Sequence, residues 1–164
     1  MISGASAKYP TMTLDDICKL PVGELADENC VLFMWWVASQ PEEAIKVAKA
    51  WGFTIKTMSG FNWVKQTNSG KLDFGMGFWT RAGSELCMIA VKGNPKRVNA
   101  GVRSVVLDVN SKHSKKPNSI RKSIETLMGD VNRVELFARD YYDGWDVWGN
   151  EVESDVFLTE YVPL

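Results

Sequence analysis

The stretch Val31-Leu32-Phe33-Met34-Trp35-Trp36-Val37-Ala38 decides the fold class of this chain. Its eight apolar residues are far fewer than the roughly 20 that a membrane-spanning helix needs. A short continuous apolar run is instead typical of a strand that is covered on both faces of a sheet. We therefore expect a buried strand over residues 30–38.

The residues on either side of this run predict helices and further strands. Upstream, Thr13 suits the N-cap of a short helix that ends before Pro21. Downstream, Pro41 suits the first turn of an amphipathic helix, and Gly52 suits its left-handed end. The other expected elements are strands over 53–65, 85–91, 104–109 and 133–138, a hairpin or bulge at Gly75 and Gly77, and a helix from Pro117 to Gly129. Alternating apolar strands and helices predict an α/β sheet with helices on both faces.

Length and composition favour one globular domain over residues 1–164. The chain has 164 residues, of which 45% are hydrophobic and 24% charged, which argues against disorder, collagen-like structure and coiled coil. Its three cysteines, Cys18, Cys30 and Cys87, are odd in number and lack metal-ligand spacing. No basic-then-apolar signal opens the sequence. We expect a reducing cytoplasmic location, no bound metal and no membrane association.

The net charge of −1 conceals two oppositely charged segments. Residues 92–122 hold nine Lys or Arg and one acid, a net +8, whereas residues 123–164 hold ten acids and two Arg, a net −8. A segment of +8 can attract a phosphate backbone. Two solvated faces of opposite sign explain the same pattern, and charge alone does not separate the two interpretations.

Three polar positions stand out as candidate binding residues. Glu135 lies inside an apolar strand, where it needs a partner: either two ribose hydroxyls of a ligand or an arginine that supports the sheet. Lys116 precedes an expected helix N-terminus, a place that favours a carboxylate or phosphate. Asn150 follows an aromatic-rich turn, and its amide can both donate and accept.

Nine short segments occur in the order seen in one known family. They are Lys8–Thr13, Val31–Val37, Ala50–Phe53, Trp63–Lys65, Gly77–Arg81, Val91–Pro95, His113–Pro117, Glu135–Arg139 and Trp145–Glu151. In them the chain resembles the MT-A70 family, S-adenosylmethionine-dependent adenine methyltransferases of messenger RNA with phage and bacterial DNA relatives. The resemblance covers nearly the whole chain and implies a Rossmann-like methyltransferase sheet.

The resemblance also implies roles for individual residues. Lys116 resembles the lysine that holds the methionine carboxylate of the cofactor S-adenosylmethionine, and Glu135 resembles the acid that binds its ribose. Arg139, Asn150 and Glu151 match the nucleoside end of that pocket, and Tyr141 stands where some members have histidine. The residues expected to contact nucleic acid are Lys65, Phe78, Trp79, Lys96, Arg97, Lys112, His113 and Lys115.

The sequence departs from the family at its catalytic signature. Neither Asp-Pro-Pro-Trp nor Asn-Pro-Pro-Tyr occurs in the chain, and the family carries this signature shortly upstream of the segment at Tyr9. We therefore expect an N-terminally truncated domain with no catalytic residue of its own. It should lack the central strand between residues 31–37 and the strand of Glu135. Those two strands close up, a second chain fills the gap as a homo- or heterodimer, or the polypeptide is a fragment.

Two functions follow from these observations. The first is an adenine methyltransferase domain that acts on the 6-amino group, on DNA ahead of RNA. The second is a catalytically inactive relative that binds nucleic acid or a partner subunit.

Overall fold

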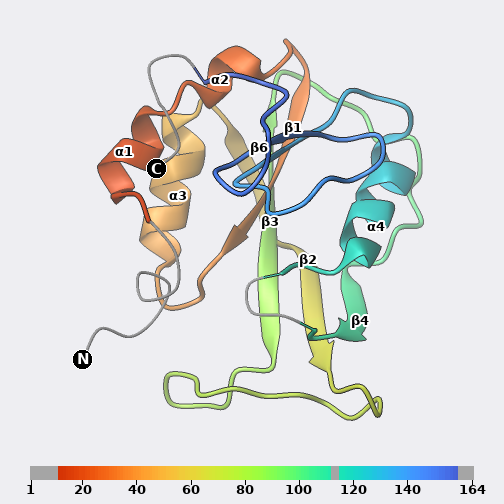
Figure 1. The fold of residues 1–164 in the computed structure, drawn as a ribbon. Coiled ribbons are helices and arrows are strands. Elements are labelled where there is room, and N and C mark those ends of the chain that lie inside the picture. Colours follow the sequence, from red (N-terminus) through yellow and green to blue (C-terminus); the bar gives the residue numbers. More distant parts are fainter. Residues whose placement is uncertain (1–10, 112–114, 159–164) are drawn as a thin grey trace. The chain divides into compact units, whose positions relative to one another are not determined.

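The structure is a computed structural model that describes residues 11–111 and 115–158 (Figure 1). The chain divides into two compact units. One unit comprises Met1–Leu25 with Asn132–Leu164, and the other comprises Ala26–Val131. Within the described residues, no helix has both the length and the apolar character needed to cross a bilayer.

The second unit is built on a four-stranded mixed sheet. Its strands are β1 (Cys30–Trp36), β2 (Thr54–Gln66), β3 (Ser84–Lys92) and β4 (Val105–Val109). They lie in the order β1-β3-β2-β4, with antiparallel pairing except between β2 and β4, which are parallel. Helices α3 (Pro41–Ala50) and α4 (Asn118–Met128) flank the sheet (Figure 1). The expected α/β class is confirmed.

Aromatic side chains form the core of one sheet face. The Phe33 and Phe61 ring centroids lie 6.1 Å apart, and Trp35 meets Trp63 edge to face at 6.4 Å. Phe61 and Trp63 are each 1% exposed. Edge-to-face pairs of this kind add about 0.5–1.5 kcal/mol beyond the area they bury. Cys87 and Met88 of β3 are also buried, so the core of this unit is centred on β2 and β3.

The expectation of a buried strand at residues 30–38 is wrong in one respect. β1 forms there, but all seven of its residues are only half-buried. The physical reason is its place in the sheet: β1 pairs with β3 along its length, and no described strand pairs with its other edge. Among the described residues, the strand of Glu135 pairs with residues 146–148 in a two-stranded sheet that does not include β1.

The first unit holds short elements only. α1 (Leu14–Lys19) begins as expected at Thr13, whose Oγ accepts the Asp16 N–H at 3.2 Å, and α2 (Val22–Leu25) follows. β5 (Val134–Leu136) and β6 (Asp146–Trp148) form a parallel pair. The sequence indicated an aromatic turn where β6 lies, because a three-residue strand is too short to show periodicity. Its Val147 and Trp148 are buried.

Candidate functional site

The carboxyl ends of the parallel strands β5 and β6 gather four of the predicted cofactor residues. Glu135 lies half-buried on β5, directly opposite Val147 of β6. Just past the strand ends, the Arg139 Nε lies 3.2 Å from a Glu151 carboxylate oxygen. Both of these side chains are 41% exposed, so the ion pair orients them and adds little stability. Asn150 is exposed beside Glu151.

Tyr141 connects the two loops that follow these strands. Its hydroxyl oxygen accepts the Glu153 N–H at 2.6 Å, so the ring of Tyr141 is anchored to the loop after β6. Gly149 brings the same loops together, since a Cβ at this position would lie 2.4 Å from the Ala138 carbonyl oxygen. Only a residue without a side chain permits this approach. The predicted ribose contact of Tyr141 stays a prediction.

Phe137 is a feature of this edge that the sequence did not reveal. Its backbone has a φ of 56°, which is unusual for a residue with a side chain, and its ring meets Trp148 edge to face at 5.2 Å. A left-handed backbone at such a residue costs about 1–3 kcal/mol and is found preferentially at binding sites. No sequence pattern signals a positive φ at phenylalanine.

In the second unit, one carboxylate joins two predicted binding lysines. The Lys65 Nζ lies 2.9 Å from one oxygen of Glu85, and Lys116 donates to the other. Each ammonium also lies 5.2 Å from the centroid of a tryptophan ring, Lys65 over Trp63 and Lys116 over Trp35. We call Lys65, Glu85 and Lys116 the lysine–glutamate triad. It brings together residues expected to bind different ligands.

Electrostatics keep Glu85 ionised. Burial by itself would raise its pKa, but the ammonium groups of Lys116 and Lys65 outweigh burial and hold the pKa of this carboxyl below its usual value. By contrast, burial raises the pKa of the nearby Cys87 thiol to about 12, so this cysteine is no nucleophile at neutral pH. Sequence reasoning missed Glu85, although this residue, like Glu135, is a carboxylate within an apolar strand.

Lys116 lies at the start of a helix, as expected. α4 begins at Asn118, with Pro117 as its N-cap and no acidic residue in its first turn. Ser119 donates to the Asp108 carboxylate at 2.5 Å, which ties the helix start to β4. Lys115 is half-buried beside it. Lys112 and His113 lie outside the described residues.

The segment between β2 and β3 presents the two predicted stacking residues to solvent. It carries a bridge between Gly75 and Ala82, which confirms the expected hairpin. At its tip, Phe78 is 80% exposed, and Trp79 is fully exposed with a φ of 69°. Exposed aromatic rings have the chemistry to stack on bases.

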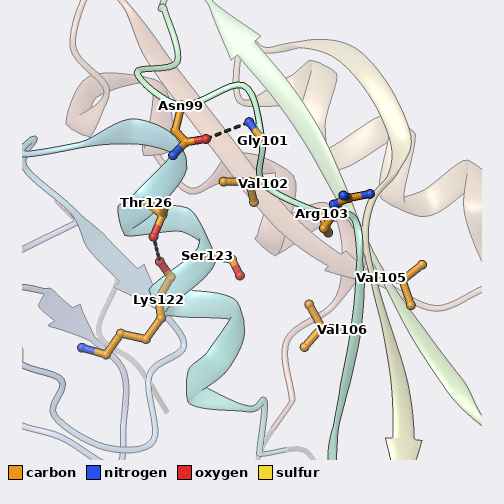
Figure 2. Close-up of a pocket in the computed structure, with 9 residues that line it drawn as sticks. All are labelled: Asn99, Gly101, Val102, Arg103, Val105, Val106, Lys122, Ser123 and Thr126. Carbon is orange, nitrogen blue, oxygen red and sulfur yellow. Dashed lines mark hydrogen bonds between the residues drawn. The ribbon is translucent and has the colours of Figure 1, made fainter.

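Figure 2 shows a shallow pocket of about 340 Å³, whose lining includes none of the triad residues. Its nine lining residues are Asn99, Gly101, Val102, Arg103, Val105, Val106, Lys122, Ser123 and Thr126. The cationic groups of Arg103 and Lys122 point away from each other in Figure 2, so they form no fixed anion site. The predicted contacts Lys96 and Arg97 are exposed outside this pocket.

The chain is similar to known proteins along most of its length. Residues 1–151 match the MT-A70 family. The chain is 33% identical to the type II methyltransferase M.MunI of Mycoplasma over 156 residues, which are 94% of the chain and 64% of that protein. It is 30% identical to the human N(6)-adenosine-methyltransferase catalytic subunit METTL3 over 152 residues, which are 89% of the chain and 26% of METTL3. The chain thus spans less than two thirds of either relative.

Proposed function

This chain belongs to the MT-A70 family, an adenine methyltransferase family, and from this we propose that it binds S-adenosylmethionine and an adenine-containing nucleic acid as part of an N6-adenine methyltransferase. The observation that carries the proposal is the set of polar side chains at the carboxyl ends of β5 and β6, where open α/β sheets bind ligands. We place DNA ahead of RNA, because the bacterial relative matches over more of its length and the resemblance associates bacterial members with DNA.

The residues of this chain fit the chemical groups of the cofactor. The Lys116 ammonium has three donors, of which the Glu85 carboxylate takes one, so it retains donors for the methionine carboxylate. Glu135 is an acceptor for the ribose hydroxyls, and the Asn150 amide suits the nucleoside. When bound, S-adenosylmethionine supplies a methyl group on a positively charged sulfur.

The hairpin and the basic segment would bind the nucleic acid. Phe78 and Trp79 present flat apolar rings to a base, while Lys65 sits at the base of the hairpin and can face the backbone. Methyl transfer also needs acceptors for the hydrogens of the adenine amino group. No Asp-Pro-Pro-Trp occurs among these 164 residues, so we propose that such acceptors come from elsewhere in the assembled enzyme.

Calorimetric titration tests the proposal. We expect S-adenosylmethionine and S-adenosylhomocysteine to bind, and Glu135→Gln to weaken both at least about tenfold, because a charged acceptor of hydroxyl hydrogens is removed. Glu42→Gln, an exposed change on α3, is the control. Absence of binding by the unaltered chain would refute the methyltransferase interpretation. Methyl transfer to adenine-containing oligonucleotides, with and without about 30 family residues added upstream, separates a binding domain from an active one.

The alternative function is that of a subunit that binds nucleic acid without catalysis. The segment of net charge +8 at residues 92–122 supports this alternative. Replacing Lys96, Arg97, Lys112 and Lys115 with alanine should weaken oligonucleotide binding. It should also reduce the slope of log affinity against log salt by roughly one for each phosphate that is no longer neutralised. Alanine at Lys46 and Lys49 of α3, outside the basic segment, is the control for a general loss of positive charge. An unchanged slope would show that the segment is only a solvated face.

A further inference from the structure

One carboxylate balances two ammonium groups in the lysine–glutamate triad. The Glu85 oxygens are divided between Lys65 and Lys116, and the three side chains are between 22% and 29% exposed. The triad carries a net charge of +1, so it does not provide a separate counter-charge for each lysine. Among the described residues, Glu85 is the acid with which each of the two lysines forms an ion pair.

The two lysines are proposed to bind different ligands. Lys116 precedes α4 and is proposed to hold the cofactor carboxylate, whereas Lys65 ends β2 beside the hairpin and is proposed to face the nucleic-acid backbone. A cofactor carboxylate that accepts from the remaining donors of Lys116 would divide the charge of this ammonium between two acids, so that Glu85 is balanced mainly by Lys65. A phosphate that approaches Lys65 would then compete more strongly with the Glu85 carboxylate at close range, where little water screens the charges.

We infer that Glu85 is a positioning residue that couples the cofactor and nucleic-acid sites negatively, through the shared ion pairs of Lys116 and Lys65. This inference rests on the proposed function. It predicts that the carboxylate of a bound cofactor lowers the affinity of the protein for a nucleic-acid phosphate. Equilibrium coupling is reciprocal, so the nucleic acid weakens cofactor binding by the same factor.

Two nucleosides test the amino-acid end of the cofactor. They share the adenosine and the thioether, but 5′-methylthioadenosine lacks the carboxylate of S-adenosylhomocysteine together with its α-ammonium. The measurement is the Kd of an adenine-containing DNA oligonucleotide by fluorescence anisotropy, with saturating amounts of either nucleoside. In the unaltered chain we expect binding to be about fivefold weaker with S-adenosylhomocysteine than with 5′-methylthioadenosine, at the lower end of typical coupling.

Glu85→Gln should bring this ratio close to one, because glutamine keeps the shape and removes the shared charge. Lys65→Gln should do the same from the other side of the triad, so the inference does not depend on a single variant. Glu42→Gln should retain the fivefold ratio. Circular dichroism confirms that each variant is folded.

The outcomes separate the inference from the proposed function. Binding of both nucleosides and the oligonucleotide, with the same ratio in the unaltered chain and in Glu85→Gln, would overturn the coupling and leave the proposed function intact. A ratio of one in the unaltered chain would overturn it equally. If neither nucleoside binds, the proposed function and the inference fall together.

Discussion

Lys116→Met is expected to weaken S-adenosylhomocysteine binding at least about tenfold and to leave 5′-methylthioadenosine binding unchanged. The reason is that an ammonium–carboxylate hydrogen bond contributes about 1.5–3 kcal/mol, and 1.4 kcal/mol is a factor of ten in affinity. Methionine keeps most of the apolar stem of lysine and removes the ammonium, which lies 5.2 Å from the centroid of the Trp35 ring. Calorimetric titration of both nucleosides measures the difference.

Lys122→Met is the matched control for this change. Lys122 lies on α4, the helix that Lys116 precedes, and its side chain is 68% exposed against 22% for Lys116. We expect this variant to bind both nucleosides as the unaltered chain does. Equally weakened binding of the two nucleosides in Lys116→Met would contradict the assignment, because it would indicate a general disturbance of the fold instead of a missing partner for the carboxylate.

Gly149→Ala is expected to destabilise the protein by about 1–3 kcal/mol, the usual cost of forcing an atom into a packed site. The new Cβ would lie 2.4 Å from the carbonyl oxygen and 3.0 Å from the nitrogen of Ala138. Both are backbone atoms, and the Ala138 N–H donates to the Trp148 carbonyl at 2.9 Å, so they cannot move without separating the two strand ends. Urea unfolding measures the cost.

The same change should also weaken nucleoside binding, because Asn150 and Glu151 follow Gly149 directly. Gly75→Ala is the control, since its Cβ would lie 3.9 Å from its nearest neighbour, the Ala82 carbonyl oxygen, and its φ is not positive. Equal stability and equal affinity for 5′-methylthioadenosine in Gly149→Ala and Gly75→Ala would contradict this prediction. The close approach at this strand end would then be needed neither for folding nor for binding.

Local signals predicted most of the elements correctly. The N-cap at Thr13, the left-handed Gly52, the helix end at Gly129, and the strands around Trp63 and Met88 are all found. Each of these depends on neighbours within a few residues, through capping, backbone sterics or alternation along a strand. β6 and α2 were missed because three or four residues carry too little pattern.

The candidate site was predicted less completely, because side-chain partners are chosen across the fold. Glu135 and Asn150 were predicted as candidates from their own chemistry. Glu85 was not, since its role depends on Lys116, 31 residues away, and on Lys65 of a neighbouring strand. The left-handed Phe137 likewise depends on the packing of β5 against β6.

The order of residues in this chain is enough to establish its family, its α/β class and the local ends of most helices and strands, because these follow from short-range sterics and periodicity. Three features needed the tertiary structure: the edge position of β1, the tight approach at Gly149 and the lysine–glutamate triad. The physical reason is common to all three. Strand pairing and ion pairing join residues that are far apart along the chain. A local sequence pattern therefore does not indicate which strand or side chain will be the partner.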